Sequence, residues 1–342
     1  EIGRGHKIAF NVLNIGRLKL GARSVGAMKI ALAQSVGYAK ERQQFGKPIS
    51  NFGLIKQKIG EMAARIYVGE SMLYRTAGMI DSALSEADKE NPAEVLAVLE
   101  QYAIECSIIK AWESEALAYV VDEQVQIYGG YGYSKDYPAE RAYRDARIAR
   151  IYEGTNEINR IVIASQLLRR AKSNELPILE EAECILEGAS PSSDTLHLNY
   201  ANVVFTDEIK ILSAAKRMAL AMIGSVARKY GDRARDEQEM LGMIAEAAME
   251  IYAMESAMLR TQKLLTERGG ATAEVQADIT RVFMREAAAR IAAKAEVVAI
   301  ETADTDKEDA RFDVEQHRAP IKAIAARRRI ADSIIEAGRY NL

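Results

Sequence analysis

One apolar stripe constrains the fold more than any other feature of this sequence. Apolar residues recur three, four or seven positions apart at Ile55, Ile59, Met62, Ile66, Leu73 and Ile80. This spacing places them on one face of an α-helix, and Gly69 and Thr76 continue the same face. A buried face of this length is typical of a seam in an antiparallel helix bundle.

The composition favours a helical protein along the whole chain. The 342 residues suggest about two domains, and they include only six prolines. The formal net charge of -3 gives no sign of a nucleic-acid surface, so we expect no nucleic-acid partner. The three histidines are scattered and the two cysteines lack metal-type spacing, so we expect no metal site and two free thiols. The chain begins at Glu1 in mid-sequence, which we interpret as a piece of a longer protein.

Proline, glycine and capping residues divide the chain into elements. We expect a helix over about 6–43, a break at 44–53, the striped helix, a long helix over 91–128, a flexible loop over 129–132 and a helix from the N-cap Thr155 to about Lys172. Residues 1–172 are therefore predicted to form an up-down four-helix bundle. A linker is expected over 173–206, with a short helix over 178–186, and further helices over 207–342.

The second part of the chain repeats the first at an offset of 185. Residues 59–76 align with residues 244–261, and nine of the eighteen positions are identical. The shared Tyr-x-x-Glu-Ser and Arg-Thr pairs are more specific than matches between alanine-rich helices. We infer a duplication, so that 207–342 is a second, degenerate helical bundle. At this offset Arg42 aligns with Ala227, and nothing downstream resembles residues 152–155. We therefore expect the second bundle to share the helix packing of the first and to lack its functional residues.

One carboxylate stands in an unusual local sequence. Glu153 follows the apolar pair Ile151-Tyr152 and precedes Gly154, just before a helix. A carboxylate on a tight bend beside a bare residue can approach a substrate closely, as abstraction of a proton next to a carbonyl requires. The alternative is an ordinary solvated acid near a helix start, where acids are favoured.

Several motifs, in this order, resemble the acyl-CoA dehydrogenase family. They are Arg42-x-x-Phe45-Gly46, the run from Gln126 through Gly129-Gly130 to Asp145, and Tyr152-Glu153-Gly154-Thr155. The resemblance covers about residues 3–172. Residues 51–55 and the helical extension look most like the very-long-chain branch. The resemblance implies an FAD-dependent desaturation of fatty acyl-CoA to trans-2-enoyl-CoA, with electron-transfer flavoprotein as acceptor and a homo-oligomer, dimer or tetramer.

The resemblance also implies roles for individual residues. Glu153 matches the general base, which removes the α-proton while a hydride leaves the β-carbon for FAD. Gly16 occupies the place where some branches carry the base, so the acid at 153 fixes the assignment within the family. Substrate contacts are implied for Asn14, Arg17 and Gly154. Contacts to FAD are implied for Arg42, Gln44, Phe45, Gln126, Gly129, Gly130, Thr155 and Glu157.

Two opposing effects act on the expected base. The helix N-terminus after Gly154 lowers the pKa of Glu153 by less than about one unit. Burial under an acyl chain raises a carboxyl pKa by up to ~3–5 units, so we expect desolvation to win once substrate is bound. The family polarises the thioester carbonyl with the backbone N–H of the base and a flavin hydroxyl.

The sequence departs from the family in two respects. Gly53 stands where medium-chain relatives have glutamine, which puts one cofactor contact in doubt. The N-terminal helical domain and the middle β-domain are missing. We therefore expect that this chain alone neither binds FAD tightly nor turns over substrate.

Two other functions stay open from the sequence. An acyl-CoA oxidase shares the fold and the base, although the absence of longer insertions favours the dehydrogenase. A non-catalytic helical assembly module is the second alternative. Its basic end is either a solvated face or a site of peripheral contact with an anionic membrane, and comprises Arg311, Arg318, Lys322, Arg327, Arg328 and Arg329. Without a signal peptide or membrane span, we expect a bacterial cytoplasmic or a mitochondrial matrix location.

Overall fold

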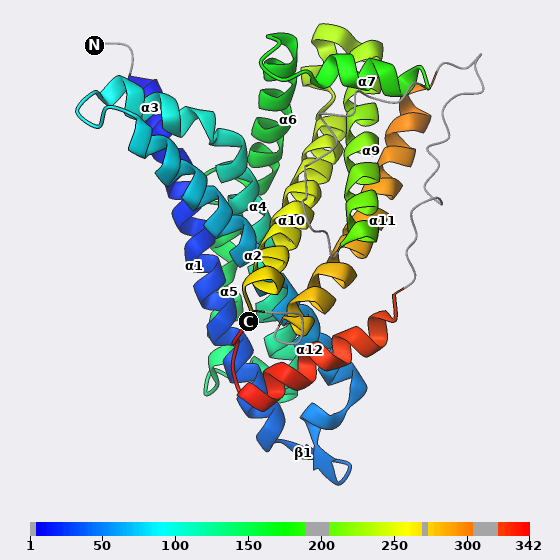
Figure 1. Cartoon of the computed structure of the whole chain (residues 1–342). Coiled ribbons are helices and arrows are strands. Elements are labelled where there is room, and N and C mark those ends of the chain that lie inside the picture. The colour runs from blue at the N-terminus through cyan, green and yellow to red at the C-terminus, as the bar shows by residue number, and fades with distance from the viewer. Residues whose placement is uncertain (1–4, 189–204, 269–272, 304–320) are drawn as a thin grey trace. The chain divides into compact units, whose positions relative to one another are not determined.

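The computed structural model describes residues 5–188, 205–268, 273–303 and 321–342. Within these ranges the chain is almost entirely helical, which confirms the all-α prediction (Figure 1). The α-helices are α1 (Gly5–Glu41), α2 (Gly53–Glu86), α3 (Pro92–Gln101), α4 (Ala103–Tyr128), α5 (Pro138–Arg147), α6 (Asn156–Lys172), α7 (Ile178–Leu186), α9 (Thr206–Tyr230), α10 (Gln238–Arg268), α11 (Glu274–Thr302) and α12 (Ala323–Ala337). The shorter elements are the ribbon of β1 (Gln43–Gln44) and β2 (Lys47–Pro48) and the 3-10 helices η1 (Ile49–Asn51), η2 (Gly129–Tyr133), η3 (Ile148–Arg150) and η4 (Gly231–Asp236).

The chain divides into two compact units. Unit 1 contains residues 1–159, 263–282 and 322–342, and unit 2 contains residues 160–262 and 283–321. These units do not coincide with the predicted boundaries, because α6, α10 and α11 are each divided between them and unit 1 includes two later segments. Domain limits at 1–172, 173–206 and 207–342 therefore stay a prediction. The short helix expected inside the linker is present as α7, with the predicted bounds.

The core of unit 1 forms where α1, α2 and α4 pack together, with α5 against α4 and α12 against α2. The apolar stripe on α2 lies inside this core, since Ile59, Met62 and Ile66 have no exposed surface. Ile55, at the start of the stripe, is only half-buried. The seam predicted from the spacing is thus confirmed along most of its length.

The long helix predicted over 91–128 is wrong in one respect, because it is broken. Asn91 begins α3 as predicted, and its side-chain oxygen accepts a hydrogen bond from the N–H of Ala93 at 3.1 Å. The chain then leaves helical geometry at Tyr102, where φ is -96° and ψ is 19°, and α4 follows. The segment after α4 also differs from the expected flexible loop, since it forms the 3-10 helix η2. There Gly132 is packed so closely that a Cβ would lie 2.4 Å from the carbonyl oxygen of Val125.

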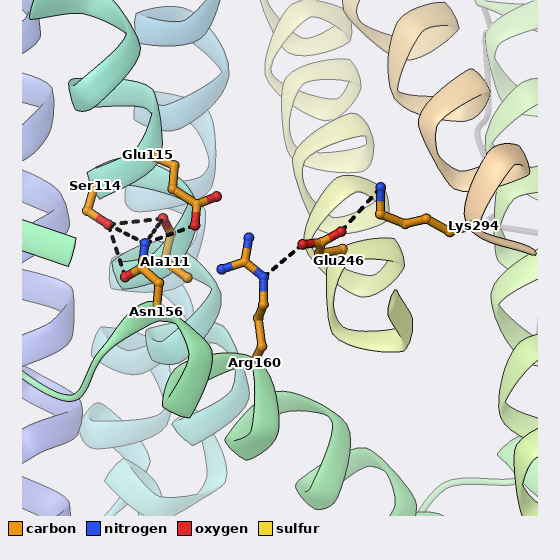
Figure 2. A network of polar contacts seen from close by, with 7 residues as sticks. All are labelled: Ala111, Ser114, Glu115, Asn156, Arg160, Glu246 and Lys294. Carbon is orange, nitrogen blue, oxygen red and sulfur yellow. Dashed lines mark hydrogen bonds and ion pairs between the residues drawn. The ribbon is translucent and has the colours of Figure 1, made fainter. Parts of the chain in front are cut away.

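Unit 2 is held by helix packing and by ion pairs between its helices. Helix α7 packs on α9, where Gly224 leaves room for Ala182. Arg290 of α11 donates two hydrogen bonds to the carboxylate of Glu250 on α10, at 2.6 and 3.0 Å. Glu246, one turn earlier on α10, lies between Arg160 of α6 at 2.9 Å and Lys294 of α11 at 3.2 Å (Figure 2).

The basic C-terminal segment is partly neutralised within unit 1. Arg329 of α12 donates two hydrogen bonds to Asp278, at 2.7 and 2.8 Å. Arg327 lies 3.5 Å from the carboxylate of Glu61 on α2. Arg311 and Arg318 lie outside the described residues. Among the described helices, none combines the length and the apolar character needed to cross a membrane.

Candidate functional site

Two buried polar residues of α1 begin the site. Asn14 and Arg17 are 5% and 7% exposed, one turn apart on the same face. Arg17 donates to the side-chain oxygen of Asn14 at 3.1 Å and to the hydroxyl of Ser107 on α4 at 3.3 Å. Asn14 in turn donates to the carbonyl of Leu99 at 3.3 Å. Burial lowers the pKa of Arg17, and these acceptors compensate its charge.

Glu153 and Gly154 form a turn in which both residues are left-handed. Their φ angles are 59° and 81°, and the first is uncommon for a residue with a side chain. The carbonyl of Glu153 accepts from Arg17 Nε at 3.3 Å. The carbonyl of Gly154 accepts from Lys110 Nζ at 2.6 Å and from Asn159 Nδ2 at 2.9 Å. The turn is therefore fixed by donors from α1, α4 and α6.

The carboxylate of Glu153 lies directly over Gly16 of α1. A Cβ on Gly16 would lie 2.7 Å from Oε2 of Glu153, closer than real Cβ atoms approach. The bare residue therefore makes room for the carboxylate. The structure thus brings together the residues for which a base or substrate role was predicted, which are Glu153, Asn14, Arg17 and Gly154.

The start of α6 is anchored to α4 by a buried amide. Thr155 caps the helix as predicted, since its hydroxyl accepts from the N–H of Ile158 at 3.3 Å. Asn156 is 3% exposed. Its side-chain nitrogen lies 3.0 Å from the hydroxyl of Ser114 and donates to the carboxylate of Glu115 at 2.9 Å (Figure 2). Its side-chain oxygen accepts from Lys110 at 2.6 Å.

A second group gathers where α1 and α4 end. The Tyr38 ring stacks on the Tyr128 ring with 4.2 Å between centroids, which ties the two helix ends together. Beyond them, the guanidinium of Arg42 lies 5.5 Å from the centre of the Tyr131 ring. Phe45 is 91% exposed, with a φ of 51°. The predicted FAD residues at this end are all exposed, and are Arg42, Gln44, Phe45, Gln126, Gly129 and Gly130.

The predicted FAD residues therefore fall into two groups. Thr155 and Glu157 lie in the segment beside Glu153, and the others lie just after α1 or at the end of α4. Arg17 and the end of α1 at Glu41 are separated by 24 positions, which is roughly 36 Å along a helix. The structure does not bring these two groups together within one chain.

A cavity of about 230 Å³ opens beside Tyr152, the residue before the predicted base. It lies between α1, α4 and α5, and Arg23 at its edge donates to the Tyr152 hydroxyl at 2.7 Å. Much of its lining is apolar, with Ala27, Ala31 and Leu117 among the contributors. Glu153 does not line it.

Sequence reasoning missed Lys110 and Asn159, which both hold the Gly154 carbonyl. Lys110 has no exposed surface, and its burial lowers its pKa to about 8. One signal was available, because Lys110 interrupts the apolar run Ile108-Ile109-Lys110-Ala111-Trp112. In the described part of the chain no cluster of acidic, histidine or cysteine residues could hold a metal ion. Cys106 and Cys184 are free thiols.

Comparison with known proteins covers most of the chain. Residues 3–168 and 214–314 each match a family model described as the C-terminal domain of acyl-CoA dehydrogenase. The chain is 40% identical to a probable acyl-CoA dehydrogenase of Bacillus subtilis (strain 168), over 100% of this chain and 58% of that protein. It is 33% identical to the mitochondrial very long-chain specific acyl-CoA dehydrogenase of Bos taurus, over 85% of this chain and 44% of that protein.

Solved structures give the same result. An acyl-CoA dehydrogenase complexed with FAD, from Bacillus anthracis, matches 100% of this chain and 59% of its own, with a TM-score of 0.91 and 40% identity. Acyl-CoA oxidase 1 of Yarrowia lipolytica covers 95% of this chain and 48% of its own, with a TM-score of 0.66 at 14% identity, and shares the fold.

These matches define a helical protein built like the C-terminal half of a flavoenzyme. The chain belongs to the acyl-CoA dehydrogenase family, as predicted, and matches that family's C-terminal domain models. It spans between 44% and 59% of the length of the dehydrogenases compared above.

Proposed function

We propose that this chain is the C-terminal part of an FAD-dependent long- or very-long-chain acyl-CoA dehydrogenase. In the whole protein it desaturates a fatty acyl-CoA to the trans-2-enoyl-CoA, as one step of fatty-acid β-oxidation. The supporting observation is the Glu153 carboxylate over Gly16, on a left-handed turn whose carbonyls are held by buried donors. The identity to very-long-chain relatives supports the chain-length class.

In this proposal Glu153 is the base that removes the proton next to the thioester carbonyl. The side chain is half-buried, so an acyl chain lying over it excludes the remaining water. A carboxylate without water around it has no competing hydrogen bonds and is free to accept the substrate proton. FAD, when bound, accepts the hydride from the β-carbon.

The backbone of the same turn supplies the second element of the chemistry. Arg17 and Lys110 hold the carbonyl oxygens of Glu153 and Gly154. Among the described residues, none accepts a hydrogen bond from the N–H of Glu153. That N–H is available to the thioester oxygen, where negative charge develops as the proton leaves.

The group at the end of α1 fits the phosphates and ring of FAD. Arg42 supplies a cation, and Phe45 supplies an exposed aromatic face. A Cβ on Gly129 or Gly130 would meet no atom within 4 Å, so nothing on that side of the backbone obstructs the approach of a phosphate. A cation for the phosphates and an aromatic face for a ring are features that suit a dinucleotide.

The separation of the two groups supports a homo-oligomer. Roughly 36 Å of α1 separates the residues around Glu153 from Arg42. We therefore infer that the group at the end of α1 serves the FAD of a second copy. This also explains why the chain alone is expected to be inactive: its site needs both the rest of the protein and a partner.

Replacement of Glu153 tests the proposal in the full-length protein. Glu153→Gln keeps the shape and removes the base, so activity with long-chain acyl-CoA should fall by about 10²–10⁴-fold. Glu180→Gln, an exposed carboxylate on α7, is the matched control and should act as wild type. Undiminished desaturation by Glu153→Gln would refute the proposal.

The electron acceptor distinguishes the dehydrogenase from the oxidase alternative. We propose electron-transfer flavoprotein as the acceptor, so the wild type should reduce that protein in the presence of acyl-CoA. Stoichiometric hydrogen peroxide from oxygen would instead identify an acyl-CoA oxidase. A chain-length profile of the same preparation measures the substrate class.

A further inference from the structure

Lys110 is a charged side chain without exposed surface, in the middle of α4. Its ammonium donates to the carbonyl of Gly154 and to the side-chain oxygen of Asn156, both at 2.6 Å. Burying an ammonium costs several kcal/mol unless acceptors compensate it. The two acceptors flank the start of α6. The ammonium of Lys110 is therefore buried at the point where the turn of Glu153 meets the helix.

The turn itself needs external support. Residues in sparsely populated backbone regions cost of order 1–3 kcal/mol each and persist only where their surroundings fix them. Glu153, with a φ of 59°, is such a residue. The carbonyl after it is held twice, by Lys110 from α4 and by Asn159 from α6. Bonds from a charged donor are roughly twice as strong as neutral ones, so Lys110 is the stronger support.

Four charged groups interact electrostatically with Lys110. Arg17 approaches from α1, Glu115 lies on α4, and Glu153 and Glu157 follow from the segment that begins α6. Three of these four are acidic, and burial still lowers the pKa of Lys110 to about 8. The three glutamates raise the pKa of Lys110 and so oppose the effect of burial.

We propose that Lys110 is a positioning residue that holds the left-handed turn and thereby aims the Glu153 carboxylate at the substrate. Lys110 acts through the backbone and needs no contact with the substrate. This inference rests on the proposed function, because it requires Glu153 to be the base.

Lys110→Met in the full-length enzyme tests the inference. Methionine fills a similar volume, but it lacks both the donor and the charge. A misplacement of about 1 Å in a reacting group costs about 10²-fold, so kcat should fall by about that factor. KM for acyl-CoA should change by less than about threefold, because Lys110 itself makes no contact with the substrate.

The matched control is Ile109→Ala, at the adjacent position of α4. Ile109 is fully buried and packs against Gly21, so its truncation weakens the bundle without touching the turn. If Lys110→Met lowers kcat no more than Ile109→Ala does, Lys110 is only structural and the inference is wrong. Equal losses of Tm in the two variants, with kcat lost only in Lys110→Met, support it.

Asn159→Leu provides a second variant should Lys110→Met fail to fold. It removes the other donor to the Gly154 carbonyl and keeps the side-chain volume. The same selective loss of kcat is expected, and an unchanged kcat contradicts the inference. Glu153→Gln is measured alongside to separate the two claims. If Glu153→Gln retains activity, the proposed function is wrong. If Glu153→Gln is inactive and Lys110→Met is fully active, only the inference about Lys110 is wrong.

Discussion

Helices α1 and α2 of unit 1 and helices α9 and α10 of unit 2 form two pairs that share a sequence echo. Helix α2 begins at Gly53 and α10 at Gln238, which repeats the offset of 185 found in the sequence. In each pair a lysine of the earlier helix contacts a glutamate of the later one. Lys29 pairs with Glu70, and Lys216 pairs with Glu255 at 2.7 Å.

The interiors of the two pairs differ. In unit 1, Gly69 leaves room for the buried carboxyl of Glu113, and neither oxygen of Glu113 has a hydrogen-bond partner. At the same offset as Gly69, unit 2 has Met254, which is fully buried. At this position unit 1 has a glycine beside a buried polar group, whereas unit 2 has a buried apolar side chain. Helix pairing thus tolerates a change of the interior at this position.

Exchanging these two residues should have the largest effect. Met254→Gly removes a fully buried side chain and places glycine within a helix, so the free energy of unfolding should fall by about 3–6 kcal/mol. Gly69→Met should also destabilise strongly, since even a Cβ at that position lies 2.5 Å from the Glu113 carboxylate oxygens. Urea unfolding of the purified chain measures both.

The control for Gly69→Met is Gly78→Met, on the same helix. Gly78 is exposed, and a Cβ there meets no atom within 4 Å. It should leave the free energy of unfolding unchanged or raise it by up to about 1 kcal/mol. Equal stability of the two methionine variants would show that Gly69 is not needed for packing.

Removing the ion pair from each pair of helices tests whether the two ion pairs contribute equally to stability. Glu70→Gln and Glu255→Gln each weaken a hydrogen bond to a charged group, which contributes about 1.5–3 kcal/mol. Glu70 also accepts from the hydroxyl of Tyr340 at 3.0 Å, so Glu70→Gln should be the more damaging. A loss confined to one variant, measured by thermal unfolding, would show that the pairs are not equivalent.

Glu113→Gln should stabilise the chain near pH 7. Burial raises the pKa of Glu113 well above 4.5, with the charge of Glu70 as a smaller cause. The folded state therefore binds a proton that the unfolded state releases, and the stability of the wild type falls as pH rises above about 4.5. The neutral amide removes this dependence. Urea unfolding at pH 5 and pH 8 should show a larger gain at pH 8, and a gain that is equal at both would contradict the assignment.

The smallest effect concerns the helices that follow each pair. Unit 1 has the broken helices α3 and α4, whereas α11 runs unbroken over Glu274–Thr302. Asn91 caps α3, so Asn91→Ala should cost about 0.5–1 kcal/mol. Asn91→Ser, which retains a capping oxygen, should restore most of the stability. If Asn91→Ala matches the wild type in thermal unfolding, the cap does not stabilise α3.

Features set by neighbouring residues were predictable from the sequence. The start of α3 at Asn91-Pro92, the cap at Thr155 and the bounds of α7 each depend on side chains within a few positions. The buried seam of α2 follows from the regular spacing of its apolar residues. The motif around Glu153 was recognisable because its residues are contiguous.

Features set by distant residues were not predictable. Lys110 reaches an acceptor 44 positions away, and Arg17 reaches one 136 positions away, so the sequence around each residue does not identify its partner. The break at Tyr102 has no glycine or proline to announce it. The left-handed backbone of Glu153 is unusual for glutamate and depends on donors from three helices.

The contact between Gly16 and Glu153 has a consequence for how such sites can diverge. Because the space over residue 16 is already occupied by the carboxylate from residue 153, only one of the two positions can bear a large side chain. An acid transferred to residue 16 would require residue 153 to become small in the same step or earlier. Helix and turn are thus alternative positions for a single carboxylate, and the two substitutions that would move it are coupled.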